Sequence, residues 1–172
     1  IYFRPNPYPP ASLRDYAAPR LAKREADAQH PGIERLFVES PAMRRVVQVQ
    51  VQHAKDQGKP APMLYLLDGV TAPKESGWLR EGNVQQLGGE QVTVVMPTEA
   101  TGSNYANWQS DDPILGRMQW ETFLTSELPT VLEKEAGLKF NGTRYIGGVS
   151  MGGSAAVRLA NLPPDLYRGT FG

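Results

Sequence analysis

The stretch YIGGVSMGGSAAVRLANL, Tyr145–Leu162, decides the fold of this chain. Its apolar beginning has the composition of a buried strand, and its alanine-rich second half has that of a helix. Between them the pentapeptide GVSMG places Ser150 in a turn flanked by Gly148 and Gly152. A G-x-S-x-G turn between a strand and a helix predicts a nucleophile elbow, with Ser150 as the nucleophile. A glycine-rich turn without chemistry is the alternative interpretation.

The elbow predicts the rest of an acyl-transfer site. The backbone N–H of Met151 would be one oxyanion donor, and the N–H of Val70, in LLDGV after an earlier strand, the other. A serine hydroxyl also needs a base, and in α/β-hydrolases an acid and then a histidine follow the serine along the chain. Both histidines, His30 and His53, precede Ser150, so neither is predicted to be the base. We expect the acid and the histidine beyond Gly172 or on a second chain.

The remaining apolar runs predict an α/β-hydrolase fold with a mainly parallel sheet and helices on both faces. PMLYLLDG and QVTVVMPTE are continuously apolar, which is typical of strands covered on both faces. VVQVQVQ alternates valine with glutamine and predicts a half-buried strand. QWETFLTSELPTVLEKEAG predicts a helix that Pro129 kinks or splits, and YRGTFG begins a further strand.

The chain divides into two parts. Residues 1–32 are rich in proline, alanine and charge and are interpreted as an N-terminal extension, with a helix interrupted at Pro19. Residues 33–172 are interpreted as the N-terminal part of a single α/β-hydrolase domain, incomplete at its C-terminal side. A sheet that stopped at YRGTFG would expose an edge and an apolar face, so we expect a missing segment or a partner chain to cover it.

Composition narrows the class of partner and cofactor. The chain has 172 residues, 40% of them hydrophobic, which suits one globular domain. Eighteen basic side chains balance eighteen acidic ones without a basic run, so nucleic acid is not an expected partner. Cysteine is absent, which excludes disulfides and thiolate chemistry. Serine acyl transfer requires neither a metal nor an organic cofactor, and none is expected.

Four segments resemble a known family. MLYLLDGV, VVMPTEATGSNYANW, WETFLTSELP and GGVSMGGSAA occur in the order and at roughly the spacing of the mycolyltransferases, the antigen 85 family of bacteria with a mycolic-acid envelope. WETFLTSELP is the most specific segment, whereas GVSMGG is shared with many esterases. The resemblance covers residues 33–172, which correspond to the N-terminal portion of such an enzyme.

The resemblance implies acyl transfer. Ser150 would take a mycoloyl chain from a trehalose ester as an acyl-enzyme and pass it to a second trehalose, to cell-wall arabinan or to water. Val70 and Met151 match the two oxyanion donors, and Asp68 matches a carboxylate that hydrogen-bonds trehalose. Thr71 stands where mycobacterial members have a sugar-contacting arginine. The family also implies glycolipid substrates and a secreted protein of the cell envelope.

Two of these roles, and the activity itself, have alternatives. Asp68 fits a turn-forming Asp-Gly pair equally well. Trp108 suits a sugar ring, but aromatic residues of such a loop more often only pack it. A carboxylesterase would use the same residues with water as the acceptor. A non-catalytic sugar- or lipid-binding relative, or an inert fragment, would need none of them.

Overall fold

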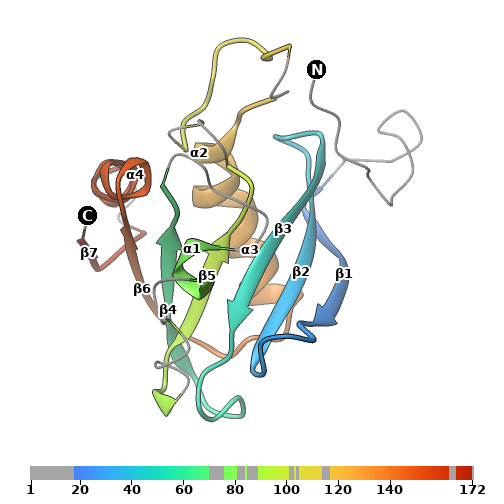
Figure 1. Ribbon diagram of the computed structural model, residues 1–172, viewed down its shortest axis with the longest axis vertical. Coiled ribbons are helices and arrows are strands. Elements are labelled where there is room, and N and C mark those ends of the chain that lie inside the picture. The colour runs from blue at the N-terminus through green and yellow to red at the C-terminus, as the bar shows by residue number, and fades with distance from the viewer. Residues whose placement is uncertain are drawn as a thin grey trace.

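The computed structural model describes residues 18–69, 76–80, 84, 89–100, 103, 105–113, 117–162 and 166–171. Within these residues seven strands form one sheet, in the order β1-β2-β3-β5-β4-β6-β7. The strands are β1 Arg20–Ala26, β2 Ile33–Ser40, β3 Arg45–Gln52, β4 Ala61–Leu67, β5 Thr93–Pro97, β6 Phe140–Gly148 and β7 Gly169–Phe171. Figure 1 shows the sheet running from β1 at one edge to β7 at the other.

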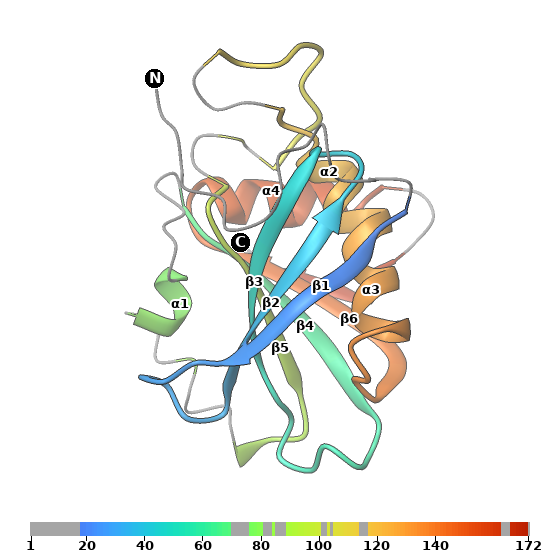
Figure 2. The ribbon, with the colours of Figure 1, turned by 90° about the vertical axis from the view of Figure 1, so that its right-hand side faces the viewer.

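The described helices lie on both faces of the sheet, as the sequence predicts. They are α1 Gly77–Arg80, α2 Trp120–Thr122, the π-helical segment η3 Phe123–Glu127, α3 Leu128–Lys134 and α4 Met151–Ala160. Figure 2 shows α1 on one side of the sheet and α3 on the opposite side. The chain thus has the three-layer build of an α/β protein.

The sheet is mixed, with one parallel and one antiparallel half. β4 pairs in parallel with β5 and β6, and β7 pairs in parallel with β6, which agrees with the strands predicted from continuous apolar runs. β1, β2, β3 and β5 pair antiparallel. The short turn at 41–44 permits only an antiparallel return from β2 to β3, because parallel neighbours need a crossover connection.

Two apolar clusters hold the layers together. The larger lies between the sheet and the helices α2 to α4, and its fully buried side chains include Leu36, Val49, Val51, Met63, Tyr65, Leu67, Trp120, Phe123, Leu124, Leu128, Leu132, Ile146, Ala155 and Ala156. The smaller lies on the α1 side and contains Ile33, Leu66, Val84, Val94 and Met96, with Trp78 packed against it. Both faces of the central strands β4 and β5 are therefore covered.

The prediction that β3 is half-buried is wrong. Gln48, Gln50 and Gln52 point away from the valines and are nevertheless buried, with exposed fractions of 5%, 0% and 3%. Two of the amides form hydrogen bonds with the chain that covers the α1 side of the sheet: Gln50 Oε1 accepts from the Ser76 N–H at 2.7 Å, and Gln52 Nε2 donates to the Val84 carbonyl at 2.9 Å. The Gln48 amide instead bonds Arg35 and Thr98. Hydrogen bonding is what makes this burial of polar groups tolerable.

The helix predicted around Pro19 is not present beyond that residue. Arg20–Ala26 is extended and forms β1, which pairs antiparallel with β2 along its length. The sheet therefore begins before Ile33. Cross-strand ion pairs support the pairing, because Arg24 donates to both carboxylate oxygens of Glu34, at 2.8 and 2.7 Å.

The long helix divides at the position that the proline predicts. α2 passes into the π-helical η3, and α3 begins with Pro129 in its first turn. Proline has no N–H to give to the preceding turn, so a change of helical geometry there costs little. The buried Glu127 in η3 receives hydrogen bonds from the Ser40 hydroxyl and from the Ala42 N–H, and so ties the helix to the turn between β2 and β3.

The described surface carries four exposed large hydrophobic side chains, Tyr145, Val149, Val157 and Phe171. They belong to β6, β7, α4 and the elbow, at the edge of the sheet that β7 forms. In the part of the chain that the structure describes, no helix is long and apolar enough to cross a membrane.

Candidate active site

Ser150 lies in the turn between β6 and α4. Its backbone has φ 55° and ψ −119°, a conformation that residues with a side chain rarely adopt. A strained serine at the end of a central strand is what a nucleophile elbow requires, because the strain lifts the hydroxyl away from the sheet. Ser150 is exposed, and Met151, buried behind it, opens α4.

The flanking glycines allow α4 to lie directly against the sheet. A Cβ atom on Gly148 would lie 2.3 Å from the backbone carbon and oxygen of Gly152. A Cβ atom on Gly152 would lie 2.4 Å from the Leu67 carbonyl oxygen and 2.5 Å from that of Asp68. Both distances are far shorter than any real contact, so only glycine fits at either position.

The end of β4 lies beside Ser150. Leu67 and Gly148 are partners in the parallel ladder, and a Cβ atom on Gly69 would lie 3.5 Å from the Ser150 Cβ. An oxyanion donor from the chain that follows Gly69 would thus have a short distance to cover. Val70, the predicted donor, and Thr71 lie outside the described residues.

Asp68 is only 2% exposed and holds the chain together locally. Its Oδ1 accepts hydrogen bonds from the Ser76 hydroxyl at 3.1 Å and from the Gly77 N–H at 3.0 Å. These contacts give Asp68 a structural role in the described part of the chain. Its predicted contact with a sugar stays a prediction.

Trp108 is half-buried in the loop that precedes α2. Its indole N–H donates to the Ser103 carbonyl at 3.0 Å, and its backbone N–H donates to the Met118 carbonyl at 2.7 Å. Neighbouring Asn107 binds Thr122 through both ends of its amide. The described contacts therefore give Trp108 and Asn107 a packing role, and the predicted sugar contact of Trp108 is not tested by them.

Both histidines lie at the end of the sheet's strands opposite to the end where Ser150 lies. His30 precedes β2 and His53 follows β3, where Gln52 pairs with Val94 near the start of β5. Ser150 follows the C-terminal end of β6. Because β5 and β6 both pair in parallel with β4, this end lies opposite to the start of β5. His53 instead contacts Glu34, with Nε2 3.1 Å from the carboxylate. Neither histidine is placed to activate Ser150.

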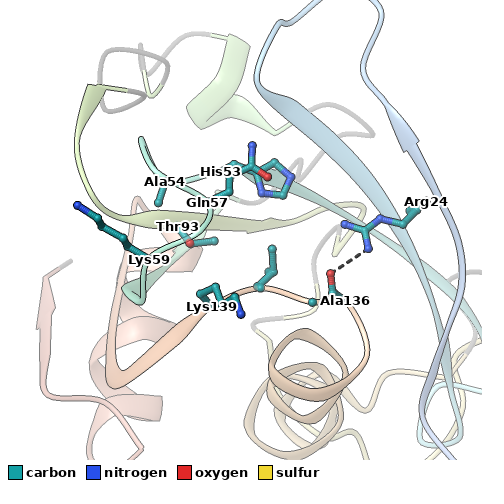
Figure 3. A pocket seen from close by; sticks show the side chains of 10 residues that line it. Arg24, His53, Ala54, Gln57, Lys59, Thr93, Ala136 and Lys139 are labelled. Atoms are coloured by element: carbon teal, nitrogen blue, oxygen red, sulfur yellow. Dashed lines mark hydrogen bonds between the residues drawn. The ribbon is translucent and has the colours of Figure 1, made fainter.

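A cavity of about 70 Å³ lies at the same end of the strands as His53, which is one of its lining residues. Figure 3 shows Arg24, His53, Lys59 and Lys139 around it, with the Arg24 guanidinium donating to the Ala136 carbonyl at 2.8 Å. The Arg24 and His53 side chains are held by Glu34, and the hydrogen bond from Arg24 lowers the pKa of the Glu34 carboxyl. This cavity is distant from the nucleophile and is not part of the candidate active site.

Sequence reasoning missed two residues that hold the chain beside Ser150. The Tyr105 hydroxyl accepts a hydrogen bond from the Asp68 N–H at 2.9 Å and donates to the Asp68 carbonyl at 3.3 Å. Burial raises the pKa of the Tyr105 phenol well above its ordinary value, so it keeps the proton that it donates. Gln50 is the second such residue. No local pattern identifies either contact, because the partners are far apart in sequence.

The described part of the chain offers no group of three or more His, Cys, Asp or Glu side chains that could hold a metal ion. The reactive group that the described site presents is a serine in a strained turn between a parallel strand and a helix. That site, at the carboxyl end of the parallel strands of this sheet, defines the α/β-hydrolase class.

Within this class the chain belongs to the esterase family, whose model matches residues 40–170. It is 39% identical over 153 residues to the MPT51 antigen of Mycobacterium leprae, an alignment that covers 88% of this chain and 48% of the relative. It is 38% identical over 142 residues to the diacylglycerol acyltransferase/mycolyltransferase Ag85A of the same organism, covering 78% and 41%. The resemblance to the mycolyltransferases is thus confirmed. The chain spans less than half the length of these curated relatives.

Solved structures confirm the α/β-hydrolase fold. The crystal structure of MPT51 from Mycobacterium tuberculosis matches with a TM-score of 0.68 at 36% identity, over 80% of this chain and 49% of that one. An S-formylglutathione hydrolase from Agrobacterium tumefaciens matches with a TM-score of 0.70, over 88% of this chain and 60% of that one. At 18% identity the second match supports the fold alone.

Proposed function

We propose that the protein is a serine acyltransferase that carries its acyl group on Ser150. The observation that carries this proposal is the backbone of Ser150, with φ 55° and ψ −119°, between a parallel strand and α4. A serine with no catalytic role would be expected to adopt an ordinary, unstrained turn conformation. Relatives named as acyltransferases and mycolyltransferases support the same reaction class.

The proposed reaction has two steps. Ser150 Oγ attacks the ester carbonyl carbon of the donor, and a C–O bond forms. The N–H groups of Met151 and Val70 donate hydrogen bonds that stabilise the negative charge on the carbonyl oxygen. The donor's C–O bond then breaks, and its alcohol leaves with a proton from the general acid. A hydroxyl of the acceptor repeats the attack on the acyl-enzyme and frees Ser150.

A base must take the proton of the Ser150 hydroxyl, and we propose that it comes from outside the described residues. The order serine, acid, histidine that is usual in this fold supports a base that follows Ser150 in the complete gene product, and a second chain is the other proposed source. The positions of His30 and His53, at the end of the strands opposite to Ser150, support this assignment.

For the substrates we propose a mycoloyl or similar long-chain acyl donor esterified to trehalose, with trehalose or cell-wall arabinan as the acceptor. Asp68 and Thr71 are proposed to contact the sugar on the basis of the family resemblance, and Trp108 because an aromatic face suits a sugar ring. Substrates of this kind imply a secreted protein of the cell envelope. Fractionation of the source bacterium tests that placement, and recovery only from the cytoplasm would reject it.

A carboxylesterase is the second candidate function, because the family model that matches the chain is that of esterases. Hydrolysis and transfer share Ser150 and the oxyanion donors, and differ only in the acceptor. Incubation of a trehalose monoester with and without free trehalose separates them. A diester product indicates transfer, whereas free acid alone indicates hydrolysis.

The proposed nucleophile is tested with a serine-directed phosphonate on the complete gene product. We expect one adduct, mapped to Ser150 by peptide mass spectrometry, and loss of both adduct and acyl transfer in Ser150→Ala. Ser154→Ala is the matched control, because Ser154 is exposed on the first turn of the same helix. Unchanged turnover in Ser150→Ala would reject the proposed function.

A further inference from the structure

Gln50 is a fully buried amide on a central strand of the sheet, at a place where an apolar side chain would be expected. It pairs with Met96 of β5 and faces the α1 side, next to the smaller apolar cluster. Its Oε1 accepts the Ser76 N–H at 2.7 Å, which fixes the orientation of the amide. Among the described residues its Nε2 has no hydrogen-bond partner. Burying such a group is costly, so a role beyond packing is indicated.

A chain of hydrogen bonds runs from Gln50 to the end of β4. Ser76, held through its N–H by Gln50, donates its hydroxyl to Asp68 Oδ1 at 3.1 Å. The next residue, Gly77, donates its N–H to the same oxygen at 3.0 Å. The carboxylate of Asp68 thus ties the chain at 76–77 to residue 68. Gln50 in turn anchors Ser76 to the middle of the sheet.

The same short stretch of backbone is held from the other side. The Tyr105 hydroxyl bonds both the N–H and the carbonyl of Asp68, and the Trp78 indole N–H donates to the Leu67 carbonyl at 3.0 Å. Asp68 is followed by Gly69, on which an added Cβ atom would lie 3.5 Å from the Ser150 Cβ. Any movement of this backbone therefore changes the geometry next to the nucleophile.

We propose that Gln50, acting through Ser76 and Asp68, is a positioning residue that fixes the Asp68–Gly69 backbone beside Ser150 for stabilisation of the oxyanion. This inference rests on the proposed function. Gln50 touches no substrate and no reacting atom. It holds the Asp68–Gly69 backbone in place, from which the chain continues to the proposed oxyanion donor. Oxyanion stabilisation depends on such preorganisation, because donors that must first move into place lose most of their advantage.

The test compares Gln50→Met with Gln52→Met in the complete gene product. Gln52 is a matched control, because it is also buried on the same face of β3, but its amide donates to the Val84 carbonyl and does not accept from the Ser76 N–H. Each variant is assayed with p-nitrophenyl butyrate and with its thiono analogue, in which sulfur replaces the carbonyl oxygen. Sulfur is a poor hydrogen-bond acceptor, so the ratio of the two kcat/KM values reports on oxyanion donors and not on overall folding.

We expect Gln50→Met to lower the oxygen-to-sulfur ratio about tenfold, a part of the 10²–10³-fold that loss of a whole donor costs. Gln52→Met should keep the wild-type ratio. Amide exchange provides a second readout: the Ser76 N–H should lose protection in Gln50→Met alone.

An unchanged ratio in Gln50→Met, with turnover that still requires Ser150, would overturn the positioning role and leave the proposed function intact. An equal fall of the ratio in both variants would also overturn it, because the effect would then be general. Turnover that does not require Ser150 would reject the proposed function, and the positioning role with it.

Discussion

Gly152→Ala should separate α4 from the end of β4. The added Cβ would lie 2.4 Å from the Leu67 carbonyl oxygen and 2.5 Å from the Asp68 carbonyl oxygen, where an ordinary contact needs at least 3.4 Å. The helix or the strand must therefore shift by about 1 Å, since backbone atoms cannot rotate aside as a flexible side chain would. The shift falls on the two residues that precede Gly69.

The expected cost follows from this displacement. Overpacking of a tight interior costs about 1–3 kcal/mol, and a clash with buried backbone belongs at the upper end, about 2–3 kcal/mol. For a domain of this size that corresponds to a fall in Tm of about 4–12 °C. Acylation of Ser150 should fall by about 10²-fold, because a misplacement of 1 Å at a reacting group has an effect of that size.

Urea denaturation and phosphonate labelling rates measure the two effects in the complete gene product. Gly89→Ala is the control, because no atom lies within 4 Å of a Cβ built on Gly89. Its free energy of unfolding should stay within about 0.5 kcal/mol of wild type or rise slightly through the unfolded state. If Gly152→Ala is as stable as Gly89→Ala, the close approach of α4 to β4 is not as described.

Three further changes test other contacts. Tyr105→Phe should cost about 1–3 kcal/mol in urea denaturation, because it leaves the buried Asp68 N–H unbonded; a loss below about 0.5 kcal/mol would contradict this. Glu34→Gln should destabilise the protein at pH 7. The difference in free energy of unfolding between this variant and wild type should shrink as the pH falls below 4.5, the ordinary pKa of a glutamate. The Arg24 hydrogen bond lowers the folded pKa of Glu34, so its stabilisation is present above the unfolded pKa and lost on protonation; a pH-independent difference would refute it. Glu127→Ala should lower Tm by several degrees through its two hydrogen bonds, and an unchanged Tm would exclude their contribution.

The sequence predicts the parallel half of the fold and the elbow well, because both depend on local pattern. Ala61–Leu67 and Thr93–Pro97 are continuous apolar runs, and burial on both faces of a parallel sheet requires that composition. The glycines around Ser150 are likewise dictated by contacts within one turn and its neighbouring strand. Local pattern therefore predicts the layers and the strained turn at Ser150.

The mistakes arise where distant contacts override local pattern. Arg20–Ala26 has helix-forming residues, and pairing with β2 makes it a strand instead. The alternation in β3 separates valine from glutamine but does not report burial, because Gln50 meets its partner 26 residues further along the chain. The hydrogen bonds that hold Asp68 escape prediction for the same reason, since Tyr105 lies 37 residues away.

The tryptophans are distributed over the two faces of the sheet, and this gives the molecule separate optical reporters. Trp78 lies on the α1 side, where its ring meets Phe171 edge to face at 6.2 Å. Trp120 is fully buried on the other side, between Tyr105 and Phe123 at 5.8 and 5.6 Å. In variants that keep only Trp78 or only Trp120, with the other two tryptophans replaced by phenylalanine, the fluorescence follows one side of the sheet alone. Loss of the two signals at different denaturant concentrations would reveal that the α1 side and the α4 side of the sheet unfold independently.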